Sequence, residues 1–209
     1  MTTLVAALIG AIIGSIGAVM AGKYVDRKAE QARKREGLVQ RYLFQLQDSI
    51  EALWYRVENL ESRGDNLQTA EAYFQVTSLY ALGRVLAIER ILAIEGVYPQ
   101  LEIYCSTLGQ FLKTNRVDSL LNVHGFYQYH RISLAEAVIE YDEQHFRAST
   151  YLEFRRRYEN SESPERKWLT PAIEAIASLS EKPALLTKLK EIALKISEQT
   201  DMPSSLKEK

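Results

Sequence analysis

Uncharged and charged positions are sharply separated at the N-terminal end of the chain. Residues 4–22 contain no charged side chain, whereas residues 23–36 hold six Lys or Arg and three Asp or Glu. About 20 helical residues at 1.5 Å each cross the hydrocarbon of a bilayer. The pattern therefore predicts a single transmembrane helix over residues 1–22, followed by a basic juxtamembrane segment over residues 23–36. A cleaved signal peptide and a buried core helix are the alternatives, and the first is disfavoured because the cations follow the apolar stretch.

The position of these cations also sets the expected topology. Lys and Arg close to a span favour the cytoplasmic side of the membrane. We therefore expect a single-pass protein with its N-terminus outside and its C-terminal domain in the cytoplasm. The basic side chains are expected to contact anionic lipid headgroups. They are Lys23, Arg27, Lys28, Arg33, Lys34 and Arg35.

Small residues recur every four positions within the apolar segment. Since lipid tails are as apolar as Leu, membrane helices associate by close packing, which small residues at i and i+4 allow. The row predicts a packing face, in the manner of a glycine zipper, against a second copy or another membrane protein. The alternative is that Gly and Ala are simply common in spans. The row consists of Ala6, Gly10, Gly14, Ala18 and Gly22.

The rest of the chain has the apolar spacing of helices, and the first such row begins at Val39. It steps by four and three residues to Leu60, as in a coiled coil. Since no Pro occurs between Gly22 and Ser62, the membrane helix is expected to continue into this one as a rod. The row could join copies of the chain, but we favour packing within the domain because the remaining helices need a partner.

Further helices are expected along the rest of the chain. The predicted fold class is all-α: the transmembrane helix continues into a cytoplasmic bundle of about five to six helices over residues 37–200, with a flexible tail over residues 201–209. Gly96 should end the central helix, and Ser133 with Glu136 has the spacing of a capping box. The expected helices are Thr69–Ile94, Pro99–Lys113, Ser133–Tyr158, a short one opened by Thr170 and Pro171, and one from Pro183.

Charge and cysteine content narrow the function classes. The whole chain has a formal charge of −1, and because residues 23–36 carry +3, residues 37–209 carry about −4. Such a balance does not favour nucleic-acid binding. The single cysteine, Cys105, allows no internal disulfide, which suits a reducing compartment. It falls on an apolar helical row, where a thiol is usually inert.

Two clusters are candidate surfaces for a ligand or partner. The first is an aromatic run around Tyr127, Tyr129 and His130, and the second is the basic triplet Arg155, Arg156 and Arg157. Aromatic loops form pockets, and Arg presents a planar fork to phosphate or carboxylate groups. The alternatives are that the rings cover the open end of the bundle and that the arginines form a solvated helix end.

The search for catalytic, cofactor and metal chemistry gives no candidate residues. Asp142 and His145 have an i, i+3 spacing, near Glu136, Glu140 and Glu143, but a di-iron bundle needs an E-x-x-H on two helices and the sequence contains none. Common nucleotide-binding, hydrolase and zinc motifs do not occur either. We therefore expect that the protein is not an enzyme.

Two functions fit this pattern. The first is a non-catalytic anchor, accessory or scaffold subunit of a membrane-associated complex, homo- or hetero-oligomeric, with a protein partner at the cytoplasmic bundle. The second is a ligand-gated membrane effector, whose glycine-lined spans assemble and perturb the bilayer. In that case the ligand must bind the two states unequally.

Overall fold

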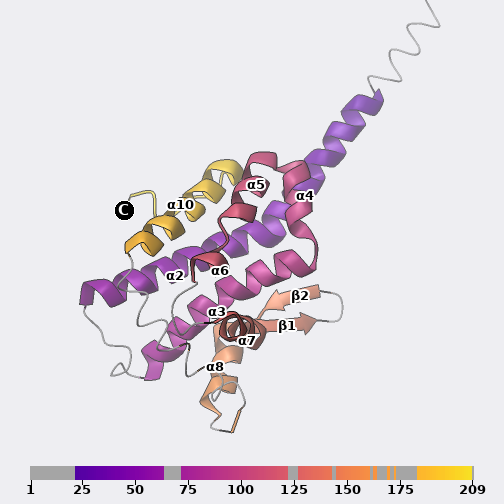
Figure 1. Ribbon diagram of the computed structural model, residues 1–209. Coiled ribbons are helices and arrows are strands. Elements are labelled where there is room, and N and C mark those ends of the chain that lie inside the picture. Colours follow the sequence, from indigo (N-terminus) through magenta and orange to yellow (C-terminus); the bar gives the residue numbers. More distant parts are fainter. Residues whose placement is uncertain are drawn as a thin grey trace, which may run out of the picture.

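A computed structural model describes most of the chain that follows the predicted span. The described residues are 22–63, 72–121, 127–142, 145–160, 162–163, 169, 172 and 183–208. They are predominantly helical, as predicted, with one two-stranded sheet (Figure 1). Within these parts of the chain, every helix is too short or too polar to cross a membrane. The predicted span lies outside the described residues apart from Gly22, and so do Ala6, Gly10, Gly14 and Ala18 of the small-residue row.

The predicted rod is present from residue 22 onwards. Residues 22–38 are helical, the π-helical turn η1 (Val39–Leu43) follows, and α2 (Phe44–Arg63) continues without a break. Residues 22–37 are all exposed, and in Figure 1 this segment projects away from the other elements. We call residues 22–37 the stalk. The helix becomes part of the core at Leu38, which is buried.

The core forms where α2 meets α3 (Ala72–Ile94) and α10 (Pro183–Thr200). The apolar row of the rod faces these helices, which confirms the expected packing within the domain. Helix α3 is apolar on most sides because it lies between α2 and the helix α7 described below. The buried residues of the row are Leu43, Leu46, Ile50, Leu53 and Val57.

The segment after α3 forms two short helices where the sequence predicts one. Gly96 ends α3 with a left-handed backbone (φ 64°), a conformation that glycine adopts without strain. Helices α4 (Val97–Tyr104) and α5 (Ser106–Thr114) are separated at Cys105, whose φ of −137° breaks the helical path. The chain folds back so closely that a Cβ on Gly109 would lie 2.5 Å from the backbone nitrogen of Glu102. The short helix α6 (Val117–Leu120) follows.

The predicted helix Ser133–Tyr158 is wrong, because a β-hairpin divides this segment. Helix α7 (Gln128–Val138) leads into strands β1 (Ile139–Asp142) and β2 (His145–Ala148), which pair antiparallel, and α8 (Tyr151–Glu159) follows. Capping boxes lie at Tyr127 with His130 and at Thr150 with Glu153, not at Ser133 and Glu136: the Thr150 backbone N–H donates to the Glu153 carboxylate at 2.6 Å. Tertiary contacts hold the hairpin on the core, since the Tyr80 hydroxyl donates to the Ser149 carbonyl at 2.8 Å.

The C-terminal helix packs along the rod. Helix α10 buries Leu185, Leu189, Ile192 and Ile196, the row expected from the sequence. The sequence predicts a flexible tail after it, whereas Met202 and Leu206 are buried. Because α2 presents polar side chains here, the tail backbone finds partners: Gln47 Nε2 donates to the Pro203 carbonyl at 2.9 Å. Thr170 and Pro171, which open the other predicted helix, lie outside the described residues.

Candidate functional site

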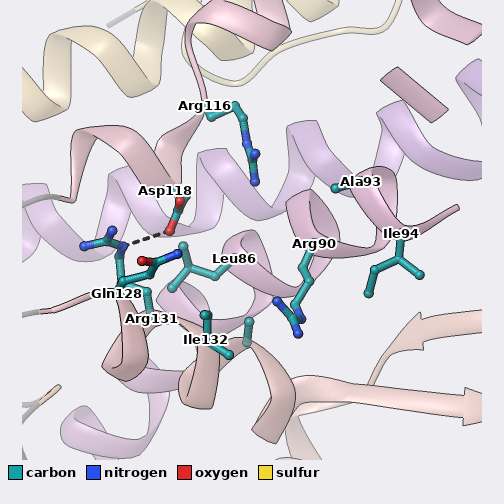
Figure 2. Close-up of a pocket in the computed structure, with 10 residues that line it drawn as sticks. Leu86, Arg90, Ala93, Ile94, Arg116, Asp118, Gln128, Arg131 and Ile132 are labelled. Atoms are coloured by element: carbon teal, nitrogen blue, oxygen red, sulfur yellow. Dashed lines mark hydrogen bonds and ion pairs between the residues drawn. The ribbon is translucent and has the colours of Figure 1, made fainter. Parts of the chain in front are cut away.

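A cavity of about 380 Å³ lies between α3, α6 and α7 (Figure 2). We call it the arginine groove because three guanidinium groups line it from different elements. Arg90 comes from α3, Arg116 directly precedes α6, and Arg131 comes from α7. The other lining residues are Leu86, Ala93, Ile94, Asp118, Gln128, Ile132 and Ala135.

Two of the arginines are held in place by neighbouring side chains. The Arg131 side chain is only 11% exposed, and its Nε donates to the Asp118 carboxylate at 2.8 Å. The Arg116 guanidinium lies over the Tyr98 ring, 5.6 Å from its centroid, which is a cation–π contact. The Arg116 Nε is buried and has no hydrogen-bond partner among the described residues. In Figure 2 the Arg116 side chain extends into the space between Asp118 and Arg90.

A buried carboxylate fastens α6 to α3 beside the groove. Glu89 is 4% exposed, and its two oxygens accept the backbone N–H groups of Val117 at 2.7 Å and Asp118 at 2.9 Å. Burial raises the pKa of Glu89 to about 7, because the cost of removing the charge from water exceeds the stabilisation from these hydrogen bonds. Glu89 therefore helps to fix the position of Asp118, which lines the groove.

The rim of the groove combines a cationic wall with an apolar one. The Arg90 Nη2 donates to the Glu136 carboxylate at 2.8 Å, and both side chains are partly exposed. Opposite charges at such an exposed position stabilise each other by less than about 1 kcal/mol. Ile94, on the apolar wall, is 51% exposed. The groove is thus open to solvent along the edge formed by α3 and α7.

The aromatic run predicted from the sequence forms the start of α7. Tyr127 and Tyr129 are 61% and 81% exposed, so in this region the rings face solvent and do not cover the bundle. The His130 Nδ1 accepts the Tyr127 backbone N–H at 3.3 Å, which helps to begin the helix. The run contributes its neighbours Gln128 and Arg131 to the arginine groove, while its own rings are not among the lining residues.

The basic triplet on α8 is partly neutralised by carboxylates. Arg155 Nε donates to Glu159 at 2.7 Å, and Arg157 lies 3.6 Å from Glu140 and donates to the Ser149 hydroxyl at 3.1 Å. Arg156 is exposed. The structure therefore does not join the triplet to the arginine groove, whose lining residues come from other elements.

Two of the carboxylates considered for a metal site pair with arginines, and Glu143 lies outside the described residues. Glu140 pairs with Arg147 and Arg157, and Glu136 pairs with Arg90. His145 lies opposite Asp142 in the hairpin register. Among the described residues, no three His, Cys, Asp or Glu side chains gather closely enough to hold a metal ion.

The predicted headgroup-binding cations all lie on the exposed stalk. Lys28 lies over the Tyr24 ring at 4.7 Å, and Lys34 pairs with Glu30 at 2.6 Å. Arg35 turns towards the bundle, where its Nη2 donates to the Gln199 carbonyl at 2.7 Å. Contact between Arg35 and a lipid headgroup would therefore compete with this hydrogen bond.

The arginine groove was not identified from the sequence. Its arginines are 26 and 15 positions apart and share no motif. The one available signal is the charged pair Glu89–Arg90 within a mostly apolar helix, where burial of a charge demands a partner. Even that signal does not reveal that the partners come from α6 and α7.

Comparison with known proteins gives no relative from which a function could be transferred. No protein-family model, curated protein or solved structure matches this chain. The function must therefore be argued from the residues and contacts described above.

Proposed function

We propose that this chain is a non-catalytic, membrane-anchored accessory or scaffold subunit. In this proposal residues 1–22 span the membrane, the stalk holds the bundle away from the bilayer, and the bundle binds a protein partner in the cytoplasm. The observation that carries the proposal is the stalk itself. It is a fully exposed helix that is continuous with α2 and carries the cations that follow the uncharged segment in the sequence.

The dimensions and charges of the stalk support an anchoring role. Its 16 residues extend about 24 Å at the α-helical rise. A helix this short and solvated is marginal by itself, so its continuity with the packed helix α2 stabilises it. Its cations would lie close to the headgroups of a bilayer that holds residues 1–22, where each contributes about 1 kcal/mol with anionic lipid.

Fractionation of the full-length chain tests the anchor. We expect a C-terminally tagged chain to remain in the membrane pellet after high salt and alkaline carbonate, and to dissolve in detergent. Replacing Ile12 and Ile13 by Arg should release it, because each charge near the middle of a span costs about 3 kcal/mol. Ile103→Arg is the matched control, since Ile103 is 71% exposed on the bundle. Recovery of the unaltered chain in the soluble fraction would contradict the anchor.

Association through the span needs a separate measurement. We expect Gly10→Leu with Gly14→Leu to weaken crosslinking between copies, or to a co-purifying membrane protein, because the larger side chains separate the helices. Leu8→Ile is the control, because it keeps the hydrophobicity of the span and should leave crosslinking unchanged. Leu8→Gly is unsuitable because it changes that hydrophobicity. Crosslinking that persists in the Gly10→Leu, Gly14→Leu variant would contradict the small-residue face.

A ligand-gated membrane effector is the second candidate, and the arginine groove is the observation that favours it. A ligand in the groove would contact α3, α6 and α7 together and so act on the same bundle that carries the stalk. Expression with a membrane-potential dye distinguishes the two functions. Depolarisation that requires Gly10 and Gly14 would support the effector, whereas unchanged potential at equal expression would support the accessory subunit.

A further inference from the structure

We propose that the arginine groove binds a phosphate monoester with a compact organic body, of about the size of a nucleoside monophosphate. This goes beyond the anchoring function and does not depend on it, because the groove belongs to the bundle alone. The inference rests on the charge of the lining side chains, their fixed positions, and the apolar wall beside them.

Charge selects the chemical class. The lining carries three Arg and one acid, Asp118, and Glu136 pairs with Arg90 at the rim. An anion that displaces Glu136 from Arg90 would therefore meet an excess of two positive charges. A phosphate monoester carries about −1.5 to −2 near neutral pH, whereas a simple carboxylate carries −1. Guanidinium groups also match the geometry of phosphate oxygens, because their planar fork donates two parallel hydrogen bonds. The excess charge of the groove thus fits a phosphate monoester better than a monocarboxylate.

Two of the three cationic groups are positioned before any ligand arrives. Asp118 holds Arg131 through its side chain, and Glu89 holds the Asp118 backbone. Tyr98 supports the guanidinium of Arg116 from one face. Donors that are already fixed lose little conformational entropy on binding, which favours affinity.

The Arg90–Glu136 pair at the rim is weak enough to open, since Glu136 is 56% exposed. Opening this pair frees the Arg90 guanidinium for an anion that enters from the solvent side. The Arg116 Nε is buried and has no hydrogen-bond partner among the described residues, so its side chain would have to move before a ligand could reach this N–H group.

The apolar wall determines the rest of the ligand. Ile94 and Ile132 are the large apolar lining residues that remain at least partly exposed, whereas Leu86 is already buried (Figure 2). A cavity of about 380 Å³ lies within the range of about 300 to 1,000 Å³ that small-molecule sites occupy. Gln128 adds an amide that donates and accepts at the edge. An organic body on the phosphate would bury this wall, which free phosphate cannot do.

Calorimetry with the full-length chain in a non-ionic detergent tests the proposal. The probes are adenosine monophosphate, adenosine, inorganic phosphate and glycerol phosphate. We expect adenosine monophosphate to bind with one equivalent per chain, and adenosine and inorganic phosphate each to bind at least about tenfold more weakly. Arg90→Gln and Arg116→Gln should each weaken adenosine monophosphate binding by about tenfold or more.

Matched variants separate this site from general charge attraction. Arg155→Gln removes the same charge from α8, where Arg155 pairs with Glu159 outside the groove, and should change binding less than about twofold. Circular dichroism identifies any variant that fails to fold, and since Arg90 is partly exposed, Arg90→Gln keeps the test usable if Arg116→Gln unfolds.

Several results would overturn the proposal. They are absence of saturable binding for both organic phosphates, equal loss in Arg155→Gln, and inorganic phosphate binding as tightly as the organic phosphates. If glycerol phosphate binds more tightly than adenosine monophosphate, the site is supported and the organic body that it accepts is smaller than a nucleoside; the opposite order supports a body of nucleoside size. None of these results alters the fractionation of the chain, so failure here is distinguishable from failure of the anchor.

Discussion

Replacing Glu89 by Gln should remove a pH dependence of stability that the buried carboxylate creates. The pKa of Glu89 is about 7 in the folded chain, against 4.5 for the ordinary carboxyl. Between these values the folded state binds a proton that the unfolded state has lost. The contribution of Glu89 to the free energy of unfolding is therefore highest below about pH 4.5 and falls as pH rises through 7. At 1.36 kcal/mol for each pKa unit, the full difference is about 3 kcal/mol.

Urea denaturation of both chains at about pH 5 and about pH 8 measures this difference. Over that interval the unaltered chain should lose roughly 2 to 3 kcal/mol more than the Glu89→Gln variant, because Gln does not titrate. Groups common to both chains cancel in the comparison. Glu136→Gln makes the same chemical change at a 56% exposed position and should retain the pH dependence of the unaltered chain. Equal pH dependence in all three chains would refute the account of Glu89.

Further predictions concern the tail, two glycines and a helix cap. Leu206→Ala should lower the free energy of unfolding by about 2 to 3 kcal/mol, because Leu206 is fully buried, whereas Leu152→Ala, at a 54% exposed position, should cost less than about 1 kcal/mol. Gly109→Ala should destabilise by at least about 3 kcal/mol, since backbone atoms lie within 2.5 Å of the new Cβ, while Gly37→Ala meets nothing within 4 Å and should stabilise by up to about 1 kcal/mol. Thr150→Ala should cost about 1 kcal/mol by removing the N-cap of α8.

These three predictions are tested by measuring the free energy of unfolding of each variant, by denaturation of the full-length chain in non-ionic detergent. A Leu206→Ala variant no less stable than Leu152→Ala would mean that the tail detaches without cost. Equal stability of the two glycine variants would show that α4 and α5 do not approach as closely as described. A Thr150→Ala variant as stable as the unaltered chain would show that the capping box does not stabilise α8.

Helices that bury one continuous apolar row were predictable from the sequence. The row from Val39 to Val57 and the row of α10 both follow the helical period, so local spacing and tertiary packing agree. The hairpin between α7 and α8 was missed because its strands are only four residues long. The capping signal at Ser133 favoured a helix over two such short strands. In the structure, tertiary contacts such as the hydrogen bond from Tyr80 to Ser149 stabilise the hairpin instead.

The arginine groove was beyond sequence reasoning for a different reason. Arg155–Arg157 attracted interest because three arginines are adjacent, yet adjacency on one helix places them among local carboxylates such as Glu159. The groove instead gathers Arg90, Arg116 and Arg131 through the packing of α6 and α7 on α3. Single-sequence patterns report neighbours along the chain, whereas such a site depends on contacts between distant segments.

The π-helical turn at the base of the stalk fixes an angle between two parts of the same rod. In η1 the Phe44 N–H donates to the Val39 carbonyl, five residues back, so this turn holds one residue more than an α-helical turn. Each residue advances an α-helix by about 100°, while adding only 1.5 Å of length. Removing one residue from Val39–Leu43 would return this turn to the α-helical period, whereas removing one from the α-helical stalk would rotate the bundle by about 100° about the rod axis while hardly changing its height. A partner that grips the rod on one side would then meet a different face of the bundle.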